Sequence, residues 1–204
     1  MSLRLFPSET RSLDLLTSLA DVLRETLAAD SELLATDEDG ERSLLTQLEH
    51  LEIKASDLHY ALLTHLRTSF VNPLPREDLY AFSRLLHSAV SAVAGAGPLL
   101  QLAGASRSDR VPELLEILGR QADLSRIALA GLGKLESLED TWLDLLRLAS
   151  RARRTQQAWL LELADIQKIS TVVRQEVLAK DLDRAAEALL GFADHLGHVL
   201  VKES

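Results

Sequence analysis

The sequence has no cysteine, only 9 glycines and 5 prolines among 204 residues, and 4% aromatic residues. The absence of cysteine excludes disulfides, thiolate nucleophiles and metal sites with cysteine ligands. Scarce glycine, proline and aromatic residues disfavour strands and tight turns, whereas leucine and alanine, which are abundant here, favour long helices. With 47% hydrophobic residues, the chain is able to bury a sizeable core. The composition therefore predicts an all-α protein.

Excess positive charge is also missing, since the formal net charge is -9. Proteins that bind nucleic acid need clustered lysine and arginine, so we expect no nucleic-acid partner. The first residues lack the pattern of a secretory signal, and we expect a cytoplasmic protein, with the inner face of the membrane as one place for it to act. The uncharged stretch between Arg84 and Arg107 is long enough to span a bilayer. It contains polar residues and the sequence Gly-Ala-Gly-Pro at 95–98, so we interpret it as a packed helix that does not span a membrane.

Apolar residues recur at alternating steps of three and four along the chain, as expected for helices with one buried stripe. We predict six long antiparallel helices, interrupted at 36–40, 72–75 and 104–110. The first three form one unit, at about 8–104, and the last three form another, at about 111–202, within a single bundle. One stripe continues without a break from Trp142 to Val177, which predicts a single helix of about 40 residues. Such long helices leave apolar surface that a second copy could cover, so a homodimer is also considered.

The segment from Phe70 to Leu79, Phe-Val-Asn-Pro-Leu-Pro-Arg-Glu-Asp-Leu, is the most informative stretch of the chain. It resembles the junction between the second and third helices of PhoU-like accessory proteins of Pit-type phosphate transporters. Residues at 5–7, 51–52 and 199–202 also fall where that family has comparable ones. The resemblance implies a PhoU-like helical bundle that serves as a non-enzymatic accessory or regulatory protein of phosphate transport. The residues themselves favour a structural role for Arg76, Glu77 and Asp78, because acids are favourable in the first turn of a helix.

PhoU-like proteins bind metal ions through carboxylates spaced four residues apart, and this pattern is eroded here. The resemblance places Glu52 and Ser56 at the first pair of positions and His87 and Ser91 at the next. The fifth helix has Arg147 and Arg151 at such positions, and only Asp183 with Glu187 keeps both acids. Tight binding of a metal cluster is therefore not expected. The candidate metal ligands are Glu52, His87, Asp183 and Glu187.

Other side chains leave further alternatives open. His195 and His198, with Asp194 beside them, have a spacing that allows two imidazoles to bind one metal, although an exposed polar flank explains them equally. Arg147, Arg151, Arg153 and Arg154 form a basic cluster, which is either a solvated helix face or a contact for an acidic loop of a partner or a lipid headgroup.

No motif of a nucleotide-binding loop, a nucleophile elbow or a zinc protease is present, so we expect no enzyme. The favoured partner is a Pit-type phosphate transporter, bound by docking of the bundle and without a cofactor. The alternatives are a helical bundle that binds a divalent metal weakly, and an oligomeric scaffold that has no ligand.

Overall fold

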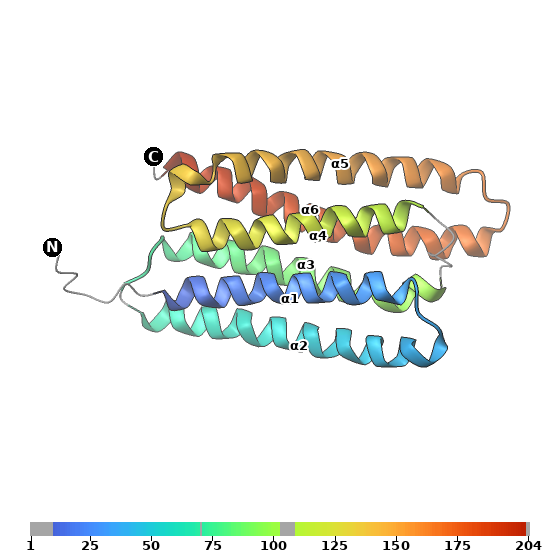
Figure 1. The fold of residues 1–204 in the computed structure, drawn as a ribbon, viewed down its shortest axis with the longest axis horizontal. Coiled ribbons are helices and arrows are strands. Elements are labelled where there is room, and N and C mark those ends of the chain that lie inside the picture. Colours follow the sequence, from blue (N-terminus) through green and yellow to red (C-terminus); the bar gives the residue numbers. More distant parts are fainter. Residues whose placement is uncertain (1–9, 70, 103–108, 203–204) are drawn as a thin grey trace.

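The computed structural model describes residues 10–69, 71–102 and 109–202. Within them, the chain forms six α-helices and one short 3₁₀ helix, and no strand (Figure 1). The helices are α1 (Arg11–Leu33), α2 (Glu38–Thr68), α3 (Arg76–Leu102), α4 (Arg110–Gly131), α5 (Glu139–Leu163) and α6 (Ile169–Lys202), and the 3₁₀ helix η2 (Leu135–Ser137) precedes α5. The prediction of an all-α bundle of six long helices is confirmed.

The six helices form two three-helix groups that pack side by side along most of their length (Figure 1). Helices α1, α2 and α3 contact one another, and so do α4, α5 and α6. The groups meet where α1 packs on α4 and where α3 packs on α6, and this second pair is the most extensive contact between any two helices. A single continuous core therefore runs through both groups.

Most residues of the apolar stripes expected in the first half of the chain are buried in the structure. On α3, for example, Leu79, Phe82, Leu86 and Val93 are fully buried. Helix α3 is long and apolar enough to cross a membrane by length and composition, but half of its most apolar window is buried inside the bundle. It also continues through Pro98 to Leu102, so the sequence at 95–98 is not a break.

The expected helix of about 40 residues through Trp142 and Val177 was wrong. Helix α5 ends at Leu163, the chain reverses over 164–168, and α6 begins at Ile169. At the end of α5 the backbone N–H groups of Asp165 and Ile166 bond to carbonyls only three residues back, which tightens and closes the helix. Beyond the turn, Val173 and Val177 are exposed, and the buried stripe of α6 follows Gln175, Leu178 and Leu182 instead.

Helix α2 begins inside the loop that was predicted at 36–40. The carboxylate of Asp37 accepts a hydrogen bond from the backbone N–H of Gly40 at 3.2 Å, which is the N-cap arrangement of a helix start. The residues 5–7 and Phe70, on which part of the PhoU-like resemblance rests, lie outside the described residues, as does most of the predicted joint at 104–110.

Candidate functional site

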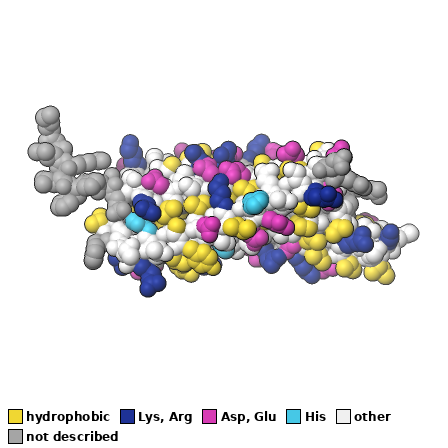
Figure 2. Space-filling model, turned by 90° about the horizontal axis from the view of Figure 1, so that it is seen from below, with side chains coloured by type: hydrophobic (Ala, Val, Ile, Leu, Met, Phe, Trp, Pro, Cys, Tyr) yellow, Lys and Arg dark blue, Asp and Glu magenta, His cyan; other side chains and the backbone are white. Residues whose placement is uncertain are grey.

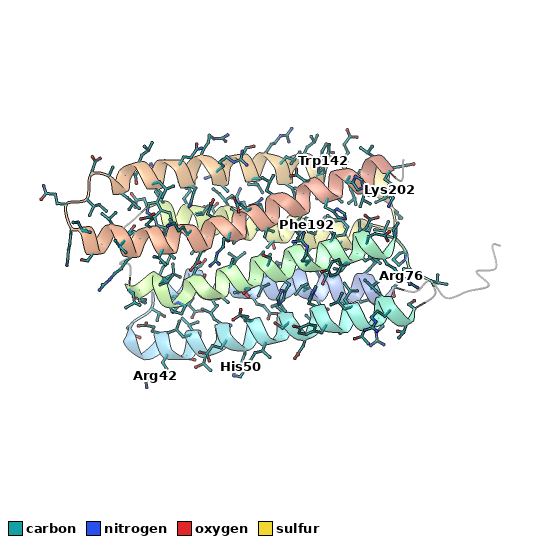
Figure 3. All side chains as sticks on the ribbon, turned by 180° about the vertical axis from the view of Figure 1, so that it is seen from behind. Arg42, His50, Arg76, Trp142, Phe192 and Lys202 are labelled. Atoms are coloured by element: carbon teal, nitrogen blue, oxygen red, sulfur yellow. The ribbon has the colours of Figure 1, made fainter. Side chains whose placement is uncertain are left out.

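The junction before α3 holds three helix ends together. Asp78 is 4% exposed, and its carboxylate accepts a hydrogen bond from Lys202 Nζ at 3.0 Å. Its other oxygen lies 3.3 Å from His195 Nε2, so two residues near the end of α6 meet one at the start of α3. Arg76 donates from its guanidinium to the carbonyl of Ser69 at 2.6 Å, which fixes the end of α2. Figure 3 shows Arg76 and Lys202 at the same end of the bundle.

His195 sits in this junction in a partly apolar environment. Its ring meets Phe82 edge-on, with ring centroids 4.8 Å apart, and it lies over His198 at 5.9 Å. Burial lowers the pKa of His195, and the neighbouring charge of Asp78 opposes that shift in part. The partner of His195 is therefore Asp78 on α3, whereas Asp194, expected beside it, is exposed.

A ladder of polar side chains, here called the α2–α3 ladder, runs along the contact between these two helices. Glu52 accepts a hydrogen bond from Ser91 Oγ at 2.8 Å, and one turn further Ser56 Oγ lies 3.1 Å from His87 Nε2. Because the helices are antiparallel, a residue one turn later in α2 meets a residue one turn earlier in α3. The ladder consists of Glu52, Ser56 and His59 on α2, and Ser83, His87 and Ser91 on α3.

The last step of the ladder pairs two histidines through their rings. His59 Nδ1 lies 2.7 Å from Ser83 Oγ, and its ring stacks on His87 with centroids 5.0 Å apart. Burial lowers the pKa of His59, and the nearby charge of His87 lowers it further. Only the fold reveals that α3 brings Ser83 and His87 beside His59.

The four candidate metal residues fall into two separate pairs. Glu52 and His87 belong to the α2–α3 ladder, each bonded to a serine. Asp183 and Glu187 lie on α6, where burial and then the charge of Glu187 raise the pKa of Asp183, while Arg153 opposes this rise. Across residues 10–69, 71–102 and 109–202, no three His, Asp or Glu side chains are close enough together to hold a metal ion.

The arginine cluster is spread around α5. Arg147 pairs with Asp144 at 2.7 Å, and Arg151 reaches Glu113 on α4 at 3.2 Å. The hydrogen bond from Arg151 is the main reason that the pKa of Glu113 is lowered. The charge of Arg153 acts on Asp183 of α6. Arg154 is exposed, and part of the positive charge of the cluster is thus compensated within the bundle.

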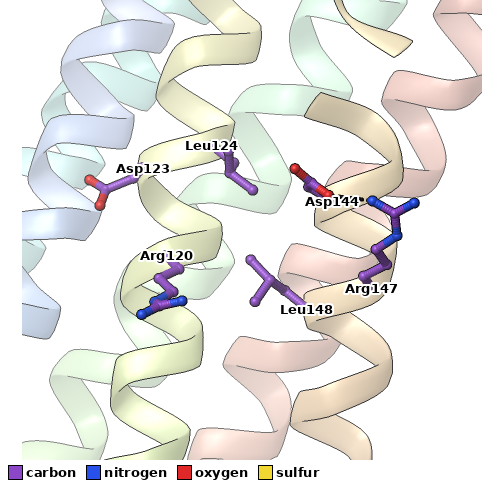
Figure 4. A pocket seen from close by; sticks show the side chains of 6 residues that line it. All are labelled: Arg120, Asp123, Leu124, Asp144, Arg147 and Leu148. Atoms are coloured by element: carbon purple, nitrogen blue, oxygen red, sulfur yellow. Dashed lines mark hydrogen bonds and ion pairs between the residues drawn. The ribbon is translucent and has the colours of Figure 1, made fainter. Parts of the chain in front are cut away.

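An open groove of about 390 Å³ separates α4 from α5 on the surface (Figure 4). Two leucines and four charged side chains form its lining. Figure 4 shows Asp144 bonded to Arg147 on one wall, while the guanidinium of Arg120 belongs to the other. Arg120 is in turn paired with Glu116 at 3.0 Å. The groove is lined by Arg120, Asp123, Leu124, Asp144, Arg147 and Leu148.

The surface elsewhere mixes charges with apolar side chains. On the face shown in Figure 2, acidic, basic and apolar groups alternate over short distances, without one extended patch of a single kind. Comparisons with known proteins add no constraint: no protein-family model matches the sequence, and no curated protein does either.

Proposed function

We propose that this chain is a non-enzymatic accessory protein of inorganic phosphate transport, which acts by docking its helical bundle on a Pit-type transporter. Support comes first from the PhoU-like resemblance in the sequence, and second from the six-helix architecture, which agrees with what that resemblance implies. Because fold alone does not define function, the proposal also depends on the contacts of the junction and on the surface of the bundle.

The observation that carries the proposal is the structural use of the resembling junction. Arg76 and Asp78, which bear the resemblance, bind Ser69, Lys202 and His195 and so join α2, α3 and α6. Residues in such contacts preserve the shape of the bundle. Most of the positions where the resemblance places paired carboxylates instead have serine, histidine or arginine, and two of these residues, Ser56 and His87, bond to each other. A bundle that keeps these shape-determining contacts but has few paired acids is better suited to docking on a partner than to binding metal ions.

The arginines of α5 offer a contact for the proposed partner. Arg153 and Arg154 are exposed and Arg151 is half-buried, and all three occur within four residues of a chain whose net charge is -9. An acidic loop on the cytoplasmic side of a transporter complements such a group. Contacts between exposed charges are screened by salt, so this binding is expected to weaken as ionic strength rises.

A pull-down against the detergent-solubilised Pit-type transporter of the same cell tests the proposal. The triple variant Arg151→Glu, Arg153→Glu and Arg154→Glu is expected to lose binding that the unmodified protein shows. The matched control changes Arg42, Arg67 and Arg84 to Glu, which alters the net charge equally at exposed positions of α2 and α3. Equal loss in both triple variants would assign the effect to overall charge. Failure of the unmodified protein to bind under any phosphate condition would exclude the transporter.

A further inference from the structure

The turn between α5 and α6 projects beyond the other helix ends at its end of the bundle (Figure 1). Helix α5 ends at Leu163 and α6 begins at Ile169, so the two helices form a hairpin with a short turn. The N–H of Ala164 bonds to the carbonyl of Leu161, and the N–H of Thr171 bonds to that of Lys168. Backbone hydrogen bonds therefore close both helix ends at the tip of this hairpin, here called the tip and comprising residues 160–174.

Large apolar side chains are exposed on this tip. Leu161 is 74% exposed and Ile169 is 78% exposed, and Val173 and Leu160 follow at 51% and 44%. The inner sides of the two helices are already occupied. Trp159 Nε1 donates to Gln175 at 2.9 Å, and Gln156 donates to the carbonyl of Ala179 at 2.8 Å. These contacts fix the two helices against each other, and the four apolar side chains remain exposed outside them.

The stretch of the hairpin that carries the tip is basic overall, although residues 160–174 of the tip itself have two basic and two acidic residues. Between Arg147 and Arg174 the chain has six arginine or lysine residues and two acidic ones, in contrast to the net charge of -9 for the whole chain. One of these acids, Glu162, is bound by Arg110 at 2.7 Å. Arg154 precedes Leu161 by seven residues, which places both on the same side of α5. Lys168 is exposed in the turn beside Ile169.

We propose that this tip inserts its apolar side chains into the headgroup region of a bilayer that contains anionic lipid. Exposed apolar side chains beside lysine and arginine are typical of segments that bind a membrane surface. The apolar side chains are buried in the bilayer, and the cations are attracted to anionic headgroups. Leu161 and Ile169 would enter the boundary between headgroups and acyl chains, while Lys168 and Arg154 would remain among the phosphates. The inference goes beyond the proposed function and does not require a transporter.

A bilayer fits this surface better than a second copy of the chain does. A stable protein interface buries about 800 Å² on each partner. Four side chains, at roughly 100 Å² each, supply only about half of that area, and they lie on a projecting end of the bundle. A bilayer needs no complementary shape, because lipids rearrange around a few inserted side chains.

Co-sedimentation of the full chain with vesicles tests this inference. Vesicles made of equal parts phosphatidylcholine and phosphatidylglycerol are expected to bind the protein at low salt, and vesicles of phosphatidylcholine alone to bind it more weakly. The double variant Leu161→Glu and Ile169→Glu should lower the partition coefficient by about tenfold or more, since two buried apolar side chains are replaced by anions. The control, Ile53→Glu with Val71→Glu, changes side chains that are 59% and 63% exposed elsewhere.

The outcomes separate the alternatives. Equal partitioning of the tip variant and the unmodified protein, or no binding to anionic vesicles at all, would overturn the inference. So would a dimer of the unmodified protein in analytical ultracentrifugation that the tip variant dissociates, because the apolar tip would then belong to an interface between copies. The detergent pull-down described above contains no bilayer, so its failure would leave the result with vesicles intact.

Discussion

At the scale of single residues, the most unusual side chain is Asp30 in the last turn of α1. It is fully buried, and within the described part of the chain neither carboxylate oxygen has a hydrogen-bond partner. A Cβ atom on Gly97 would lie 3.1 Å from one of these oxygens and would clash with the side chain of Leu48. The missing side chain of Gly97 therefore gives Asp30 its space in an otherwise apolar environment.

Burial raises the pKa of Asp30 well above its usual value, because the charged form loses its hydration. The folded state consequently retains a proton at pH values where the unfolded chain has released it. Stability linked to this group is fully present below the unfolded pKa of about 3.9. It is lost as the pH rises from there through the raised folded pKa, by up to about 1.4 kcal/mol per pH unit.

Asp30→Asn tests this linkage, because the amide has nearly the same shape and does not ionise. The free energy of unfolding of the variant should exceed that of the unmodified protein by a margin that grows with pH above about 4. Urea unfolding at a series of pH values measures the difference. Asp57→Asn, at an exposed position of α2, is the matched control. Curves for Asp30→Asn and the unmodified protein that stay parallel over the whole range would contradict the assignment.

At the scale of helices, the sequence predicts the type of each element and its buried face better than it predicts where each helix ends. Stripes of leucine and alanine identify the buried side of α1, α2 and α3, because burial needs only apolar side chains at the correct period. The same rule failed between α5 and α6, since Ile166, Val173 and Val177 continue the three-four spacing across the turn. No glycine or proline occurs at 164–168 to indicate a reversal. Only the packing of α6 back against α5 distinguishes a hairpin from one long helix.

The candidate site shows the same limit. The sequence identified Glu52, His87 and Asp78 as residues of interest, but their partners are far away along the chain. Asp78 and Lys202 are 124 residues apart, and Glu52 and Ser91 are 39 apart. Spacing along one helix reports which side chains share a face, whereas contacts between helices depend on which helices become neighbours. The four candidate metal residues lie in two separate pairs, one between α2 and α3 and one on α6.

Two helical glycines allow a matched test of close helix packing. A Cβ atom on Gly197 of α6 would lie 2.7 to 3.0 Å from the indole ring of Trp142, which is rigid. Gly119 of α4 has no atom within 4 Å of that position. Gly197→Ala is expected to destabilise the protein by about 1 to 3 kcal/mol through overpacking. Gly119→Ala should stabilise it by about 0.5 to 1 kcal/mol, because alanine favours the helix.

Thermal and urea unfolding of both glycine variants measure these changes. Near-ultraviolet circular dichroism should also report a change around Trp142 in Gly197→Ala and none in Gly119→Ala. If both substitutions were stabilising, α6 and Trp142 would have to be farther apart than the structure places them.

At the scale of the whole molecule, the two three-helix groups look like separable units in the sequence but share one core. Helix α3 packs against α6 more extensively than against any helix of its own group. The rings of Phe82 and Phe192 meet across this boundary with centroids 5.0 Å apart, and both side chains are fully buried. Asp78 adds polar contacts to His195 and Lys202 at the same boundary.

Separate expression of residues 10–102 and 109–202 tests whether either group is a folding unit. Each fragment would expose the apolar side that α3 and α6 cover on one another, so neither should reach the stability of a domain of its length. We expect helical circular dichroism, binding of a hydrophobic dye, and broad urea transitions from each fragment alone. Mixing equimolar fragments should restore a sharp transition and release the dye, because the contact between α3 and α6 re-forms without a covalent connection. A fragment that unfolds cooperatively by itself, with no change on mixing, would instead show that the core is divided at the boundary between the groups.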